Sequence, residues 1–106
     1  MSKIDLDTKV KFIHGFSHKT RIQILDSIKD NEKTVSQIVD EIEGNQSSVS
    51  QHLACLRGCG LIVSRQEGKF VYYQLRNEKV RQLLAMFDDV LIDIHMDIGT
   101  CKNHII

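Results

Sequence analysis

Proline and tryptophan are absent from this sequence of 106 residues, and cysteine occurs only three times. Proline fixes the backbone and ends helices, so its absence fits a mainly helical chain with few rigid loops. The longest apolar runs fall far short of the roughly 18 to 20 residues that cross a bilayer, and no basic-then-apolar leader opens the chain. Three cysteines cannot all pair within one chain, so no disulfide framework is expected. These absences predict one cytoplasmic domain, 1–106, with no membrane partner.

The charge of the chain is zero overall but is unevenly distributed. Residues 44–82 hold six Lys or Arg against two acids, an excess of four positive charges that the rest of the chain offsets. A local basic surface favours contact with the phosphates of nucleic acid, although the overall neutrality argues against it. A solvated surface of ordinary mixed charge is the alternative that composition leaves open.

The stretch 45–61, NQSSVSQHLACLRGCGL, has helical periodicity and a polar outer face. Val49, Leu53 and Leu56 recur at spacings of four and three, which predicts one buried stripe. The outer positions carry amides, hydroxyls and a guanidinium: Gln46, Ser47, Ser48, Ser50, Gln51 and Arg57. No acid occurs in this stretch. Such a face suits a helix in the major groove of DNA, where amides and hydroxyls bind base edges and Arg binds guanine or phosphate.

The residues before this stretch predict three further helices. A short helix is expected from Thr8 and a second over 18–30, because apolar positions recur there at helical spacing. A third is expected between Thr34 as its N-cap and Gly44 as its stop. Two helices of about ten residues joined by a Gly-containing turn, the second polar outside, form the helix-turn-helix pattern, here about 34–58.

The residues after this stretch predict a β-hairpin and a long helix. β-branched and aromatic residues over 61–75 flank a polar turn that contains Gly68, which is typical of a hairpin wing. Helical periodicity returns over 77–98 and exposes more apolar surface than a small domain can cover, so this helix is expected to form a dimer interface. A short tail, 99–106, follows. The predicted fold is mainly α (α+β), a homodimeric winged helix-turn-helix.

The cysteines form a candidate site for a soft metal ion. Cys55 and Cys59 are four residues apart on the predicted helix, so their Cβ atoms would lie about 5 to 6 Å apart on one face. This separation suits two thiolates on one ion better than a disulfide. Cys101 in the tail would complete an all-sulfur set, which selects Cd(II), Pb(II) or thiolate-bound Zn(II). The alternative is that Cys55 and Cys59 are small buried hydrophobic residues.

The segments HKTRIQILDSI, SQIVDEI, QSSVSQHLACLRGCGLI and EGKFVYYQL resemble the ArsR/SmtB repressors across nearly the whole chain. Within that family, the string CLRGCGL with a lone tail cysteine is most similar to the cadmium- and lead-sensing CmtR-type repressors. The resemblance implies an apo homodimer that binds operator DNA and is released when metal binds. It also implies that Cys55 and Cys59 of one protomer share the metal with Cys101 of the other.

The histidines offer weaker candidates for a site. Other members of the family carry an Asp-x-His at the start of the last helix, and here that position reads RNEK. Asp93 and His95 form an Asp-x-His well inside the helix, so His95 is expected to be a dimer-face or surface residue. Whether His95 or His104 forms a second site is left open. His52 is expected to face DNA or pack rather than bind metal.

These patterns predict a metal-responsive DNA-binding repressor rather than an enzyme. The candidate DNA-binding residues are Gln46, Ser47, Ser48, Ser50, Gln51, His52, Arg57, Arg65 and Lys69. One alternative is a redox- or persulfide-sensing repressor on the same fold, in which the cysteines are oxidised rather than bound to metal. A thiol enzyme is a further alternative, but the chain lacks the CxxC motif after a strand that such enzymes use, and no small organic substrate is expected.

Overall fold

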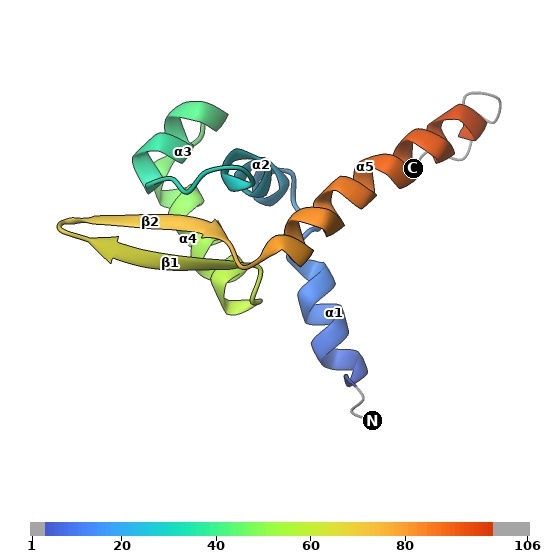
Figure 1. The fold of residues 1–106 in the computed structure, drawn as a ribbon, viewed down its shortest axis with the longest axis horizontal. Coiled ribbons are helices and arrows are strands. Elements are labelled where there is room, and N and C mark those ends of the chain that lie inside the picture. Colours follow the sequence, from blue (N-terminus) through green and yellow to red (C-terminus); the bar gives the residue numbers. More distant parts are fainter. Residues whose placement is uncertain (1–3, 99–106) are drawn as a thin grey trace. The chain divides into compact units, whose positions relative to one another are not determined.

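The computed structural model describes residues 4–98, with side chains as far as residue 94. The elements run in the order α1 (Leu6–His14), α2 (Lys19–Ile28), α3 (Val35–Ile42), α4 (Gln46–Gly58), β1 (Ile62–Glu67), β2 (Phe70–Leu75) and α5 (Glu78–Ile98) (Figure 1). They fall into two compact units that divide between Arg76 and Asn77. The first unit is a winged helix-turn-helix, which confirms the predicted fold class.

The core of the first unit lies where α2, α3 and α4 pack on one another. The α4 residues Val49, Leu53 and Leu56 are at most 1% exposed, so the buried stripe predicted from their spacing is confirmed. Six further apolar side chains of this core are at most 2% exposed: Ile24, Leu25, Ile28, Ile38, Leu61 and Ile62. Burial of one face of α4 leaves its opposite face available for other contacts.

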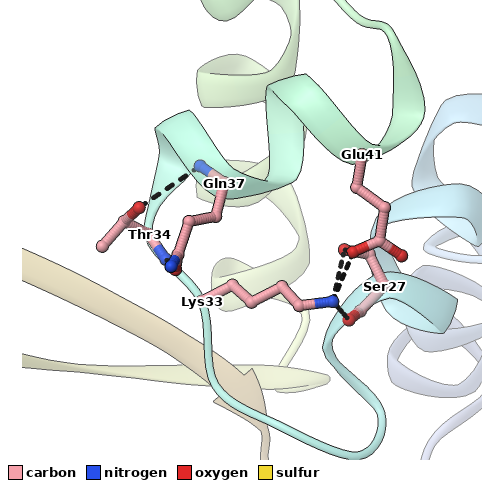
Figure 2. A network of polar contacts seen from close by, with 5 residues as sticks. All are labelled: Ser27, Lys33, Thr34, Gln37 and Glu41. Carbon is pink, nitrogen blue, oxygen red and sulfur yellow. Dashed lines mark hydrogen bonds and ion pairs between the residues drawn. The ribbon is translucent and has the colours of Figure 1, made fainter.

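The turn between α3 and α4 differs in one detail from the prediction. Thr34 is the N-cap of α3 as expected, and its hydroxyl accepts the Gln37 amide at 3.3 Å while the Gln37 side chain accepts the Thr34 amide at 2.9 Å (Figure 2). The left-handed residue that ends α3 is Glu43, with φ of 55°, and not Gly44. A Cβ on Gly44 would lie 3.1 Å from Val49, so glycine here permits the close approach of the turn to α4.

The first two helices begin at residues whose side chains accept backbone hydrogen bonds. α1 begins at Leu6, two residues before the predicted start, because Asp5 accepts the Thr8 amide at 2.7 Å. The Nδ1 atom of His18 accepts the Thr20 amide at 3.1 Å and caps α2. Histidine is not among the preferred caps, so this role gives no signal in sequence.

The wing is a two-stranded antiparallel sheet in which Ile62 pairs with Leu75 and Glu67 with Phe70. Gly68 has φ of 61°, the left-handed backbone that a two-residue hairpin turn requires. The hairpin predicted over 61–75 is therefore confirmed. Figure 1 shows its turn extending well beyond α3 and α4.

The second unit is described as far as Ile98 and consists of α5. The Asn77 side chain accepts the Val80 amide at 3.1 Å at its start, where the sequence predicted a helix. Five apolar side chains of α5 are between 41% and 61% exposed: Met86, Val90, Leu91, Ile92 and Ile94. Within residues 4–98, no helix has the length and apolar character to cross a membrane.

Candidate nucleic-acid interface and thiol site

The N-terminal half of α4 presents the predicted polar face to solvent. Gln46, Ser47, Ser50 and Gln51 are exposed, and Ser48 is half-buried. Asn45 caps the helix by accepting the Ser48 amide at 3.0 Å. The first turn of α4 carries no acid, and the amide groups at a helix N-terminus attract phosphate. This end of the helix has the hydrogen-bonding groups that a base edge or a phosphate requires.

His52 lies between the two ends of α4 and packs against α2. Its Nδ1 atom accepts a hydrogen bond from Arg21 Nε at 3.2 Å, and its ring centroid lies 4.4 Å from that of His18. Burial lowers the pKa of His52, and the nearby charges of His18 and Arg21 lower it further. Arg21 also donates to the His14 carbonyl at 3.0 Å, so it joins the end of α1 to α4. No local sequence signal predicts this role of Arg21, because a polar residue in an amphipathic helix is usually solvated.

The three predicted basic DNA-binding residues lie in different surroundings. Arg57 is exposed and donates to the Ser64 hydroxyl at 3.3 Å, which joins the end of α4 to β1. Arg65 binds two carboxylates, with Nε 2.9 Å from Glu32 and Nη1 2.6 Å from Glu67. Lys69 is exposed at the hairpin turn, with Nζ 5.6 Å from the centre of the Phe70 ring.

The C-terminal end of α4 carries the two thiols. Cys55 lies within α4, whereas Cys59 is its C-cap residue, one position beyond the last helical residue, Gly58. The Cys59 amide still donates to the Cys55 carbonyl at 3.0 Å, so the spacing of one helical turn is retained. Both cysteines are half-buried and neither forms a disulfide. The two sulfur atoms therefore belong to one helix end, as the predicted metal site requires.

The environment of Cys59 favours its protonated form. Burial raises the pKa of the Cys59 thiol, and Cys55 raises it further, while Lys11 and Arg21 partly oppose this. The thiol donates to the Lys11 carbonyl of α1 at 3.5 Å. An ion that binds here must displace the proton, so metal affinity should increase with pH.

The rest of the predicted metal site lies beyond the described part of the chain. Cys101 and His104 fall outside residues 4–98, and the side chain of His95 is likewise not among those described. Residues 4–94 contain no cluster of three or more His, Cys, Asp or Glu side chains that could hold an ion. Cys55 and Cys59 alone supply two soft donors, which fit part of a thiolate site.

The fold and the polar face of α4 define a winged helix-turn-helix DNA-binding protein. Residues 18–64 match the family model described as bacterial regulatory protein, arsR family. The HTH-type transcriptional regulator KmtR of Mycobacterium tuberculosis is 39% identical over 95 residues, which cover 90% of this chain and 72% of that protein. The chain belongs to the ArsR family of bacterial transcriptional regulators, which confirms the family resemblance and the expectation of a regulator rather than an enzyme.

Two shorter matches and one solved structure agree with this assignment. A probable mercury resistance operon repressor of Streptomyces lividans is 31% identical over 76% of this chain and 64% of its own length. CmtR of Mycobacterium bovis is 39% identical over 43% of this chain and 39% of its own length. The homodimeric winged helix-turn-helix domain of Mb0332 from M. bovis has a TM-score of 0.78 and 27% identity, and the match covers 88% of this chain and 92% of that one.

Proposed function

We propose that the protein is a homodimeric metal-responsive repressor that binds operator DNA without metal and releases it when a soft ion binds its cysteines. One observation carries this proposal: an acid-free polar face and two adjacent thiols occupy opposite ends of the same helix, α4. A helix is rigid over 13 residues, so a change in its placement at one end reaches the other.

The DNA contacts are assigned to the exposed end of α4. Gln46, Ser47, Ser50 and Gln51 bind base edges and phosphates in the major groove, and Ser48 contributes where its half-buried side chain allows. Arg57 and the wing lie beyond this end and contact the backbone. A dimer places two such helices in successive major grooves of a palindromic operator.

The metal site is assigned to Cys55, Cys59 and Cys101. Cd(II), Pb(II) and, with lower selectivity, Zn(II) suit an all-thiolate set, and the similar mercury resistance repressor agrees with a thiophilic ion. When Cys59 gives up its proton to bind metal, its sulfur can no longer donate to the Lys11 carbonyl. Metal binding therefore removes a contact between α1 and α4, and only such a difference between two states can shift their balance.

The raised pKa of Cys59 supports metal binding over thiol oxidation. The thiolate is the nucleophile in redox chemistry, and a half-buried thiol with a raised pKa is a poor one. A metal ion compensates by supplying positive charge directly at the sulfur.

The dimer interface is assigned to the exposed apolar residues of α5. Leu91 is 59% exposed in the single chain, so an aspartate there is harmless to an isolated helix but has no partner in an apolar interface. Leu91→Asp should yield monomers with weak operator affinity, because a palindrome is bound by two recognition helices. Sedimentation that shows an intact Leu91→Asp dimer would reject this interface.

Operator release by Cd(II) tests the function. The operator is first recovered from random duplexes by selection with the reduced, metal-free dimer. Cd(II) should then lower operator affinity about 5- to 150-fold and produce a sulfur-to-metal ultraviolet band. Cys55→Ser should abolish operator release, weaken the band because only two of the three thiolates remain, and leave the metal-free affinity unchanged. Release by Cd(II) that persists in Cys55→Ser would exclude the thiol site.

Mixed dimers test the position of Cys101. One chain carries Cys101→Ser and the other carries both Cys55→Ser and Cys59→Ser. If the tail ligand comes from the partner, one complete three-sulfur site forms in each mixed dimer. If the mixed dimers show no such site while the parent does, Cys101 binds within its own chain.

A further inference from the structure

The wing is fixed to the helix-turn-helix by two neighbouring residues of the α2–α3 loop. The Glu32 carboxylate binds the Arg65 guanidinium on β1, with Nε–O distances of 2.9 and 3.0 Å. The backbone of Lys33 exchanges two hydrogen bonds with Tyr73 on β2, at 3.0 and 2.8 Å. One loop therefore holds both strands of the hairpin.

The same loop is held against both helices that it connects. The Lys33 side chain forms an ion pair with Glu41 on α3 and donates to the Ser27 carbonyl of α2 (Figure 2). Ser27, the buried hydroxyl in this network, donates to Glu41 at 3.1 Å. The position of the wing is thereby tied to the placement of α3, the first helix of the helix-turn-helix.

The Arg65 side chain is already bound to other side chains of the protein. Its guanidinium lies between Glu32 and Glu67 and stacks 4.9 Å from the centre of the Tyr72 ring. The Arg65 contact lowers the pKa of Glu32, which shows that the ionised pair is favoured. Two carboxylates around one guanidinium leave a net negative charge, which repels a phosphate. Lys69, at the hairpin turn, forms no ion pair with any residue of the described chain.

We propose that Arg65 is a positioning residue that holds the wing on the α2–α3 loop, and that Lys69 makes the phosphate contact of the wing. This rests on the proposed function only in that the protein binds duplex DNA. It gives the two basic wing residues different roles, although the sequence predicts both as DNA-binding residues.

Amide hydrogen exchange of the protein without DNA tests the link itself. Arg65→Gln and Glu32→Gln should each speed exchange at the Lys33 and Tyr73 amides. The hydrogen bonds between these two residues then lose the support of the adjacent ion pair. Lys69→Gln, the matched control at the turn, should leave both rates unchanged. Parent-like exchange at both amides in the folded Arg65→Gln and Glu32→Gln variants would overturn the proposal. This outcome is independent of whether the protein binds DNA or metal.

Salt dependence of duplex binding then separates the two roles. Lys69→Gln should reduce the slope of log affinity against log salt by about 1 per wing, because a phosphate contact is lost. Arg65→Gln should lower affinity with the slope retained. Glu32→Gln should lower affinity to the same extent, and the double variant should be no weaker than either single one, because both substitutions break one link. A reduced slope in Arg65→Gln together with higher affinity in Glu32→Gln would show instead that Arg65 contacts phosphate.

Discussion

The two ends of α4 are built from the same helix but meet different surroundings. Its first six residues, 46–51, are mostly exposed and polar, with Val49 as the inward residue. Its last turn and the following cap hold Cys55 and Cys59, which are half-buried, and Cys59 contacts the backbone of α1. The exposed end has groups free to bind an external partner, whereas the thiol end is already joined to another helix. A ligand at the thiol end would, on the proposed function, alter the contact between Cys59 and α1.

The largest expected effect comes from disrupting the buried side of α4, which lies beneath both of its ends. Leu53 is 1% exposed and lies between them, so Leu53→Ala should leave a cavity and destabilise the protein by about 2 to 5 kcal/mol. Chemical denaturation measures this loss. A change below about 1 kcal/mol would mean that the core beneath α4 does not hold the helix in place.

A cysteine substitution should affect only the thiol end. Cys59→Ser keeps a hydroxyl that can donate to the Lys11 carbonyl but removes a soft ligand, so metal-free operator affinity should be retained. The lowering of operator affinity by Cd(II), worth about 1 to 3 kcal/mol in the parent, should disappear. Titration of fluorescent operator with and without Cd(II) measures both quantities. Weak metal-free binding in Cys59→Ser would show that the two ends are not separable.

A glutamine substitution should affect only the exposed end. Gln51→Ala should weaken operator binding by about 1 to 3 kcal/mol if Gln51 binds a base, with the Cd(II) charge-transfer band unchanged. Gln82→Ala, an exposed glutamine on α5, is the matched control and should bind as the parent does. Parent-like affinity in Gln51→Ala, with folding intact, would remove this residue from the contacts.

The smallest effect concerns His52, which lies between the two ends. Its pKa is lowered by burial and by His18 and Arg21, so folding favours the neutral ring over the protonated one. In the unfolded chain this histidine takes up a proton near pH 6.5, whereas the native protein resists protonation at that pH. The free energy of unfolding is therefore highest above that pH and falls as the pH drops below it. Denaturation between pH 5 and 7.5 should show this loss, and His52→Gln should flatten the curve in this window. An equal pH dependence in His52→Gln would assign it to other groups.

Local sequence patterns predicted the helices and strands well, because the apolar spacing and cap residues that specify each element lie within or beside it. The spacing of Val49, Leu53 and Leu56 identified the buried side of α4, and Thr34 identified the start of α3. The left-handed residue at Glu43 was missed because glycine is the usual residue in that conformation. Apolar periodicity and cap chemistry thus fixed the helices to within about two residues.

The partners of the polar residues could not be predicted in the same way. Glu32 and Arg65 are 33 positions apart, and Arg21 and His52 are 31 apart, so they meet only after the chain folds. The excess of positive charge over residues 44–82 includes Arg65 but not its partner Glu32, which lies outside that range. The cysteine pair was predictable because one helical turn separates its members. Cys101 lies outside the described residues, so its part in the site stays a prediction.

The coupling between the two ends of α4 is tested most directly by the affinity of Cd(II) for the parent dimer, measured with and without saturating operator. Linkage requires that DNA weaken Cd(II) binding by the same factor by which Cd(II) weakens DNA binding. The account predicts equal factors, within the range of about 5 to 150. Cd(II) affinity that is the same with and without operator would contradict it, because the thiols and the polar face would then act independently.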